Sequence, residues 1–327
     1  MKKIVILHTD VSHDAAEDEL DGLIQAEKVS KAISELGDEP VLLPFGMDLD
    51  KTIDGLRMLR PDIVFNLVET VGGRGNMIYF ATALLDSLRL PYTGCRTEAM
   101  FITSDKPLTK KIMKANGVAT PPWVTVDGGA GESAHPGTYL LKASWEDASV
   151  GLDEEAILKT SDHKALRDAV QNRQKKLGID CFAEAYIEGR EFNIALLASD
   201  QGVRLLPTSE ILFVDYPPDK LKLLDYRAKW VENSFEYDNT RRTLDFEPRD
   251  ERLVAHLREI ALQCWTLFDL RGYARVDFRV DQKGQPWVLE INANPCLSPD
   301  AGFAAALEHA GIKYSEAIDD ILRNALR

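Results

Sequence analysis

The stretches Arg275-Val-Asp277-Phe-Arg-Val280 and Val288-Leu-Glu290-Ile-Asn292-Ala-Asn-Pro295 decide the fold of this sequence. Both are typical of β-strands, which we predict over residues 272–280 and 286–292. Side chains alternate along a strand, so Glu290 and Asn292 share one face, as Arg275 and Asp277 do on the neighbouring strand.

If the two strands pair, oxygen ligands from Asp277, Glu290 and Asn292 converge. Hard oxygen ligands suit Mg²⁺ (or Mn²⁺), which usually binds a few carboxylates together with substrate phosphates. A lone pair of carboxylates is more often an exposed strand face. The combination of R-x-D with E-x-N-x-N-P on adjacent strands is far more specific, and it predicts a metal site.

The pattern of the chain changes upstream of this hairpin. Strands and helices alternate in the N-terminal third, which is typical of a parallel sheet flanked by helices. We predict strands over 3–7, 40–44 and 62–66, and helices over 18–36, 48–59 and 77–88. After Pro121-Pro122 short strands dominate, with helices over 162–177, 249–268 and 313–325. Residues 213–247 are the least regular and are long for a loop, as lids and binding loops often are.

Composition limits the classes of protein that this chain can be. It has 327 residues, with 39 Lys and Arg against 53 Asp and Glu, which gives a formal charge of −14. At roughly 100–200 residues per domain, this length predicts two or three domains. The acidic balance disfavours nucleic acid and anionic membrane surfaces as partners, because both need clustered Lys and Arg. A nucleotide is not disfavoured, because a few local cations and a metal ion override the mean charge.

Cysteine usage and hydropathy indicate the compartment. The four cysteines are scattered and form no CxxC pair, so reduced thiols are expected. The N-terminus lacks the long apolar region of a signal peptide, and no apolar run approaches the roughly 18 residues of a membrane span. We therefore expect a cytoplasmic enzyme.

Two further segments suggest a nucleotide. Lys142 ends an apolar strand, and the small residues Ala148-Ser149-Val150-Gly151 follow it, so that backbone N–H groups and an ammonium are available to phosphates. The segment Glu184 to Glu191 reads as strand, turn and strand, and it can offer backbone groups to adenine and carboxylates to ribose. Taken alone, each feature has a more ordinary explanation, a solvated lysine in the first case and a charged hairpin in the second. Neither GxxxxGK[ST] nor a GxGxxG after the first strand is present, which disfavours a P-loop NTPase and a Rossmann dehydrogenase.

In this order, the segments resemble the ATP-grasp superfamily and, within it, the D-alanine–D-alanine ligases. The resemblance covers nearly the whole chain, through Phe65-Asn-Leu, Leu90-Pro-Tyr-Thr-Gly94, Ser104-Asp-Lys106, Thr120-Pro-Pro-Trp123, Lys142, Ser149-Val-Gly151, Glu184-x-x-Ile187, Gly189-Arg-Glu191, Leu206-Pro-x-x-Glu210-Ile, Ala228-Lys229, Arg275-x-Asp277-Phe and Glu290-Ile-Asn292. It implies an α/β fold in three parts, with ATP held between the last two. These are an N-terminal parallel α/β domain (1–97), an ATP-grasp small lobe (98–187) and a C-terminal ATP-grasp lobe with the metal site (188–327), the two lobes being α+β in character.

The resemblance also implies roles for individual residues. Lys106, Lys142 and Ser149 would bind phosphates, while Glu184, Ile187 and Glu191 would line the adenine and ribose site. Lys229 would reach the terminal phosphate, and Arg275 would face the reacting carbonyl. Asp277, Glu290 and Asn292 would hold the metal ion.

The sequence departs from the ligase pattern where the ligases bind their two D-alanines. Asp10-Val-Ser12 and an acidic run stand where the ligases carry Gly-Gly-x-Ser, and Glu69-Thr70 stands in place of His-Gly. Ala148 removes one hydroxyl of the ligases' Glu-Gly-Ser-Ser. Cys296 replaces the Gly of Asn-Thr-x-Pro-Gly, and Ala301-Gly302 replaces Ser-Leu. The ATP and metal half is kept. An anionic Glu69 would favour an amino group on the first substrate, and Ala301 loses the hydroxyl that would hold the acceptor's carboxylate.

The implied activity is an ATP-dependent ligase that forms an amide or peptide bond through an acylphosphate. Its partners would be a small-molecule carboxylate and an amine, each an amino acid or peptide, and a homodimer is left open. The departures favour a bulkier amine or a peptide over D-alanine as acceptor. Two alternatives stand beside this hypothesis: a true D-alanine–D-alanine ligase, and a nucleotide-binding regulator without catalysis.

Overall fold

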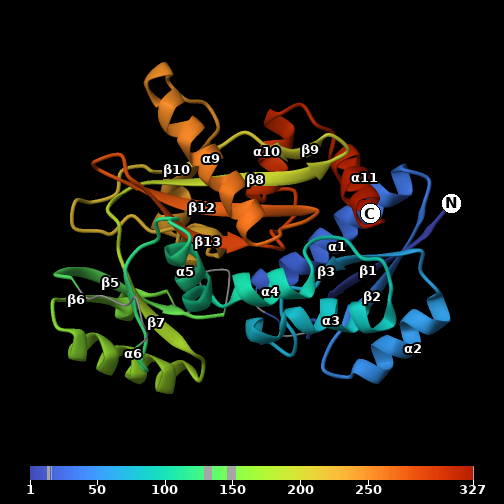
Figure 1. Cartoon of the computed structure of the whole chain (residues 1–327), viewed down its shortest axis with the longest axis horizontal. Coiled ribbons are helices and arrows are strands. Elements are labelled where there is room, and N and C mark those ends of the chain that lie inside the picture. The colour runs from blue at the N-terminus through green and yellow to red at the C-terminus, as the bar shows by residue number, and fades with distance from the viewer. Residues whose placement is uncertain (13–14, 16, 129–134, 146–151, 327) are drawn as a thin grey trace.

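The computed structural model describes the chain except for residues 13–14, 16, 129–134, 146–151 and 327. Its elements form three groups around three sheets (Figure 1). The N-terminal group is a parallel sheet of order β2-β1-β3, as the alternating pattern predicted. Its elements are β1 (Lys3–Thr9), α1 (Glu17–Glu35), β2 (Glu39–Phe45), α2 (Leu49–Leu59), β3 (Ile63–Leu67) and α3 (Tyr79–Leu88).

The second group, at the lower left of Figure 1, is an antiparallel sheet of order β4-β7-β5-β6 with one helix against it. Its elements are β4 (Trp123–Val124), β5 (Gly137–Ala143), β6 (Ile157–Thr160), α6 (His163–Leu177) and β7 (Cys181–Ala185). Leu166 and Val170 of α6 are buried against Tyr139 and Leu141 of β5. The amphipathic spacing of the helix therefore gives this small lobe a core of its own.

The third group is a larger antiparallel sheet of order β11-β10-β8-β12-β13, in which β9 also pairs with β8. Its strands are β8 (Gly189–Ser199), β9 (Gly202–Leu205), β10 (Ser209–Phe213), β11 (Thr240–Thr243), β12 (Tyr273–Asp281) and β13 (Pro286–Asn292). Its helices are α7 (Tyr226–Trp230), α8 (Phe235–Asn239), α9 (Glu251–Leu267), α10 (Gly302–His309) and α11 (Tyr314–Asn324). Within the described residues, no helix is long and apolar enough to cross a membrane.

Gly189 begins β8 where the chain passes from the small lobe to the large sheet. Its φ is +155°, and a Cβ there would lie 1.9 Å from the carbonyl oxygen of Val280. A side chain is therefore excluded by the backbone of β12, so this position needs glycine.

The predicted α/β class is confirmed, and the differences are local. Three helices were not predicted, namely α4 (Thr97–Ser104), α5 (Lys106–Ala115) and α10. Met100 and Met113 of α4 and α5 pack with Phe192 and Phe278 of the large sheet, so tertiary contacts stabilise these two helices. The predicted irregularity of residues 213–247 is wrong in part, because α7, α8 and β11 lie within this segment.

Candidate active site

The predicted hairpin brings the proposed metal ligands together. Asp277 on β12 is the register partner of Glu290 on β13, and Arg275 is the partner of Asn292. Arg275 donates two hydrogen bonds to Asp277, from Nε to Oδ1 (2.7 Å) and from Nη2 to Oδ2 (2.8 Å). The same guanidinium lies 3.9 Å from Glu290 Oε1. Four side chains on two strands thus share one face of the sheet, as their alternation predicted.

The pKa values of the two carboxylates shift in opposite directions. Burial raises the pKa of Asp277, although the paired Arg275 offsets part of this effect. Burial also opposes ionisation of Glu290, but the positive charges of Lys106, Lys229 and Arg275 outweigh it and hold the pKa at about 2. Glu290 is therefore an anion throughout the physiological range, surrounded by cations that also attract phosphates.

The donor set fits a hard divalent cation. Carboxylate oxygens of Asp277 and Glu290 and the amide oxygen of Asn292 are available on neighbouring strands. Asn292 Oδ1 accepts a hydrogen bond from the backbone N–H of Asn294 (2.9 Å), which orients the amide and leaves its second lone pair for a ligand. No group of three or more His, Cys, Asp or Glu side chains that could hold a metal occurs among the described residues. Two carboxylates and one amide leave the remaining positions to phosphate oxygens and water, as Mg²⁺ usually requires.

Three predicted lysines surround this hairpin. Lys106 lies in the first turn of α5, with its Nζ 3.9 Å from Glu290 Oε2. Lys142 on β5 and Lys229 on α7 line the same cavity as Glu290. Burial and the nearby Arg275 lower the pKa of Lys229, while Glu290 and Asp277 oppose this shift. Asp225 caps α7 by accepting a hydrogen bond from the N–H of Ala228 (2.8 Å), and this fixes the turn that carries Lys229.

Glu184 on β7 is held by two lysines. Its Oε1 accepts a hydrogen bond from Lys142 Nζ, and its Oε2 lies against Lys110 Nζ, both at 2.6 Å. Burial opposes ionisation of Glu184, yet the two ammonium groups lower its pKa. Both carboxylate oxygens therefore face lysines, which orients Lys142 toward the cavity. Lys110 also donates to Thr120 Oγ1 (2.7 Å).

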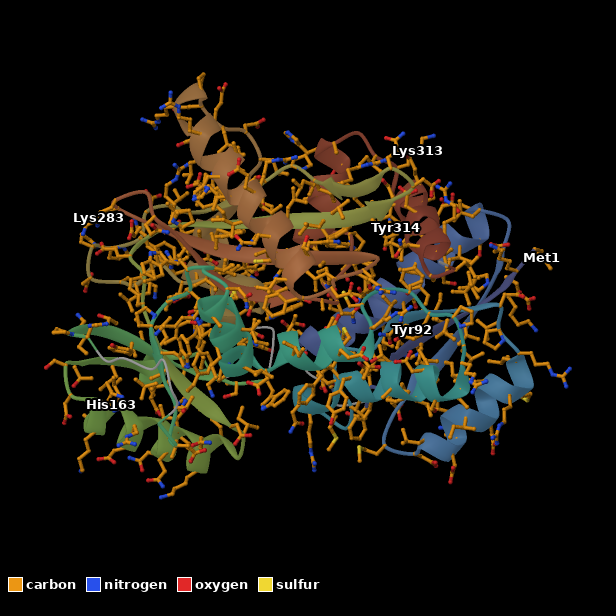
Figure 2. The ribbon with its side chains drawn as sticks, in the orientation of Figure 1. Met1, Tyr92, His163, Lys283, Lys313 and Tyr314 are labelled. Atoms are coloured by element: carbon orange, nitrogen blue, oxygen red, sulfur yellow. The ribbon has the colours of Figure 1, made fainter. Side chains whose placement is uncertain are left out.

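The other residues that the sequence predicts to bind a nucleotide lie beside Glu184 and its two lysines. Ile187 and Glu191 line one cavity between the small lobe and the large sheet, together with Leu140 and Leu289. Glu191 Oε2 lies 3.2 Å from Arg279 Nε, a residue that the sequence interpretation missed. Arg279 is two residues from Asp277 on the same strand, and this spacing could have placed it on the same face. In Figure 2, His163 and Lys283 mark these two lobes on the side of the molecule away from Met1. Ser149 lies outside the described residues.

A second cavity, of about 520 Å³, continues from the first. Lys229 and Leu224 line both, so the two cavities meet at these residues. Its walls have opposite charges. The N-terminal wall carries Glu19, Asp21 and Glu69, and the opposite wall carries Lys229, Arg241, Arg242 and Arg275, with Asp300 beside Arg242. Of these, Arg241 and Arg242 carry no pattern in the sequence that marks them, because they come together with the others only in the fold.

Glu69, at the end of β3, is anchored in this wall. Its Oε1 accepts a hydrogen bond from Gln25 Nε2 (3.0 Å), and Gln25 Oε1 accepts one from the N–H of Leu297 (2.7 Å). Cys296 donates from Sγ to Asp21 Oδ2 (3.0 Å). Burial and the neighbouring carboxylates raise the pKa of this thiol. Of the departures noted in the sequence, Glu69-Thr70, Cys296 and Ala301-Gly302 thus line one cavity, and Ala148 lies outside the described residues.

Comparison with known proteins shows to which family this chain belongs. The family described as "D-ala D-ala ligase C-terminus" matches residues 112–323. The chain belongs to the D-alanine–D-alanine ligase family. A D-alanine–D-alanine ligase from Aquifex aeolicus is 30% identical over 298 residues, which cover 90% of this chain and 92% of that protein. The uncharacterized protein y4sG from Sinorhizobium fredii is 32% identical over 311 residues, covering 92% and 87% of the two chains.

Solved structures agree on the fold of this family. The D-alanine–D-alanine ligase from Bacillus anthracis in complex with ATP superimposes with a TM-score of 0.71 at 19% identity, covering 100% of this chain and 98% of that one. The predicted enzyme class, an ATP-dependent ligase that forms carbon–nitrogen bonds, is confirmed by membership of the D-alanine–D-alanine ligase family.

Proposed function

We propose that this protein uses ATP to join the carboxylate of one amino acid or peptide to the amine of another. ATP phosphorylates the donor carboxylate, and the acceptor amine attacks the resulting acylphosphate and expels phosphate. The observation that carries the proposal is the meeting of the two cavities at Lys229. Beside Lys229 lie the Asp277–Glu290 pair and Arg275.

The nucleotide would lie between the lobes. Lys106 and Lys142 contact its phosphates, and Ser149 belongs to the loop proposed to contact them as well. Ile187 and Glu191 border the adenine and ribose, while Glu184 acts by orienting Lys142. Asp277, Glu290 and Asn292 would hold Mg²⁺ or Mn²⁺, which neutralises phosphoryl oxygens during transfer.

The reacting groups would meet at the junction of the cavities. Lys229 contacts the transferred phosphoryl group and spreads its charge. Arg275, oriented by its two hydrogen bonds to Asp277, faces the oxyanion that forms when the amine attacks. A planar guanidinium held at two points loses little freedom on donating to that oxyanion. No side-chain nucleophile takes part in these steps.

The charged walls suit zwitterionic substrates. Ammonium groups are attracted by Glu19, Asp21 and Glu69, and carboxylates by the arginines opposite. We propose that the acceptor differs from D-alanine and is a bulkier amine or a peptide, because Glu69, Cys296 and Ala301-Gly302 replace the residues by which the ligases grip D-alanine. Family membership favours a second candidate, D-alanine–D-alanine ligation itself.

A substrate-dependent ADP screen tests these proposals. ADP release is measured with ATP, Mg²⁺ and pairs drawn from amino acids and short peptides, with D-alanine alone as one member. Ligation of other pairs with little D-alanyl-D-alanine supports the altered acceptor. Robust D-alanyl-D-alanine synthesis at millimolar substrate supports the second candidate. Nucleotide binding without ADP release for any pair contradicts both and supports a non-catalytic regulator.

A further inference from the structure

Arg242 on β11 has a position that the proposed steps do not use. Its register partner is Ile211 on β10, and both residues line the second cavity. Ile211 in turn pairs with Glu191 on β8, which pairs with Arg279 on β12. Because cross-strand partners share a face, Arg242 lies on the face of the sheet that carries Asp277 and Arg275.

The guanidinium of Arg242 lies over the beginning of α10. Its Nη1 donates to the backbone oxygen of Asp300 (3.3 Å). Its Nη2 is 3.6 Å from the position that a Cβ on Gly302 would take. Ala301 and Gly302 are the residues that stand where the ligases carry Ser-Leu. A guanidinium from another strand therefore lies beside these small residues.

The charge of Arg242 is not balanced by a carboxylate in direct contact. Among the residues that the structure describes, no Asp or Glu side chain lies within ion-pair distance of it, whereas Arg275 is paired with Asp277. Its side chain lines the second cavity. Burial and the like charge of Arg275 lower its pKa, and Asp300 offsets this only in part. An anion between the two guanidiniums would relieve their repulsion.

We propose that Arg242 is a specificity-determining residue that binds the carboxylate of the acceptor, so that the acceptor is an amino acid or peptide with a free carboxylate rather than a simple amine. This inference rests on the proposed ligase function. The guanidinium can donate two parallel hydrogen bonds to a carboxylate and cannot do so to a carboxamide. The acceptor amine would then point from β11 toward Arg275 and Lys229, where the acylphosphate forms.

The test compares acids with their matched amides. Rates of ADP release are measured at saturating ATP and donor with glycine, D-alanine and dipeptide acceptors, and with the carboxamide of each. The enzymes are the wild type, Arg242→Gln, Arg242→Lys and the control Arg249→Gln. Arg249 is exposed and pairs with Glu247 outside both cavities, so its substitution removes the same charge at a surface site.

The wild type and Arg249→Gln should prefer acids over amides by about 10–100-fold in kcat/KM, as expected for a charge-assisted hydrogen-bonded pair. Arg242→Gln should lose this preference through a higher KM for acid acceptors, with the KM for ATP and the melting temperature unchanged. Arg242→Lys should keep part of the preference. An unchanged preference in Arg242→Gln, or equal use of acids and amides by the wild type, overturns the inference alone. No ADP release with any acceptor contradicts the proposed function, and the inference with it.

Discussion

Replacing Lys110 by Met removes one of the two ammonium groups that hold Glu184. The side chains of Lys110 and Glu184 are only 1% and 3% exposed, and their charged atoms are 2.6 Å apart. Removing one partner of a buried ion pair typically costs about 3–5 kcal/mol, because the other charge stays buried. Lys142 still contacts Glu184 in the variant, so we expect the lower end, about 3 kcal/mol.

Urea denaturation measures this loss. With an m-value of about 3 kcal/mol/M, a loss of about 3 kcal/mol lowers the unfolding midpoint by about 1 M. Lys111→Met is the matched control, because Lys111 lies on the same helix with an exposed side chain, and its change should stay within about 0.5 kcal/mol.

A double variant tests whether the contact itself is responsible. Lys110→Met combined with Glu184→Gln should lose less stability than the two single variants together, by about 1 kcal/mol or more. A Lys110→Met protein within about 0.5 kcal/mol of the wild type, or fully additive losses, would refute the buried ion pair as the cause.

Four further predictions follow from the site. Glu290→Gln should abolish ADP release at ordinary Mg²⁺, because it keeps the shape and loses a ligand charge, and normal ADP release by the folded variant would exclude the metal role. Arg275→Lys should lower kcat by about 10²–10³-fold through loss of the planar donor, and near-wild-type turnover would contradict this. Residues 213–247 should be cleaved by protease in the free protein and protected by nucleotide with Mg²⁺, whereas equal cleavage rates count against a lid. Cys296 should resist iodoacetamide at pH 8, because a raised pKa confines its reactive thiolate to more alkaline pH, and rapid labelling measured by mass spectrometry would show that its pKa is not raised.

The sequence was sufficient to predict the parts of the site that local periodicity controls. Two-residue alternation placed Arg275 and Asp277 on one face of their strand, and Glu290 and Asn292 on one face of the next. The register of the hairpin brings these two faces together. The parallel N-terminal sheet followed from alternating strands and helices. These features depend on neighbours that are close in sequence.

Features that depend on distant segments were not predictable. Glu184 lines the same cavity as Ile187 and Glu191, but the sequence did not predict that Lys110 and Lys142 reach it from α5 and β5. Helices α4 and α5 pack through Met100 and Met113 on the core of the large sheet, which is far from them in sequence. Arg242 reaches α10 from β11, which lies in a segment predicted to be irregular. This strand is recognised only through its pairing with β10.

The transfer of a carboxylate oxygen to phosphate tests the central claim most directly. The donor amino acid or peptide is labelled with ¹⁸O in both carboxylate oxygens, and the phosphate released during ligation is analysed by mass spectrometry. An acylphosphate route requires that the oxygen which attacks the γ-phosphorus leaves with the phosphate when the amine attacks carbon. We predict one ¹⁸O atom in each phosphate released. Unlabelled phosphate, formed in step with the amide product, would contradict the mechanism.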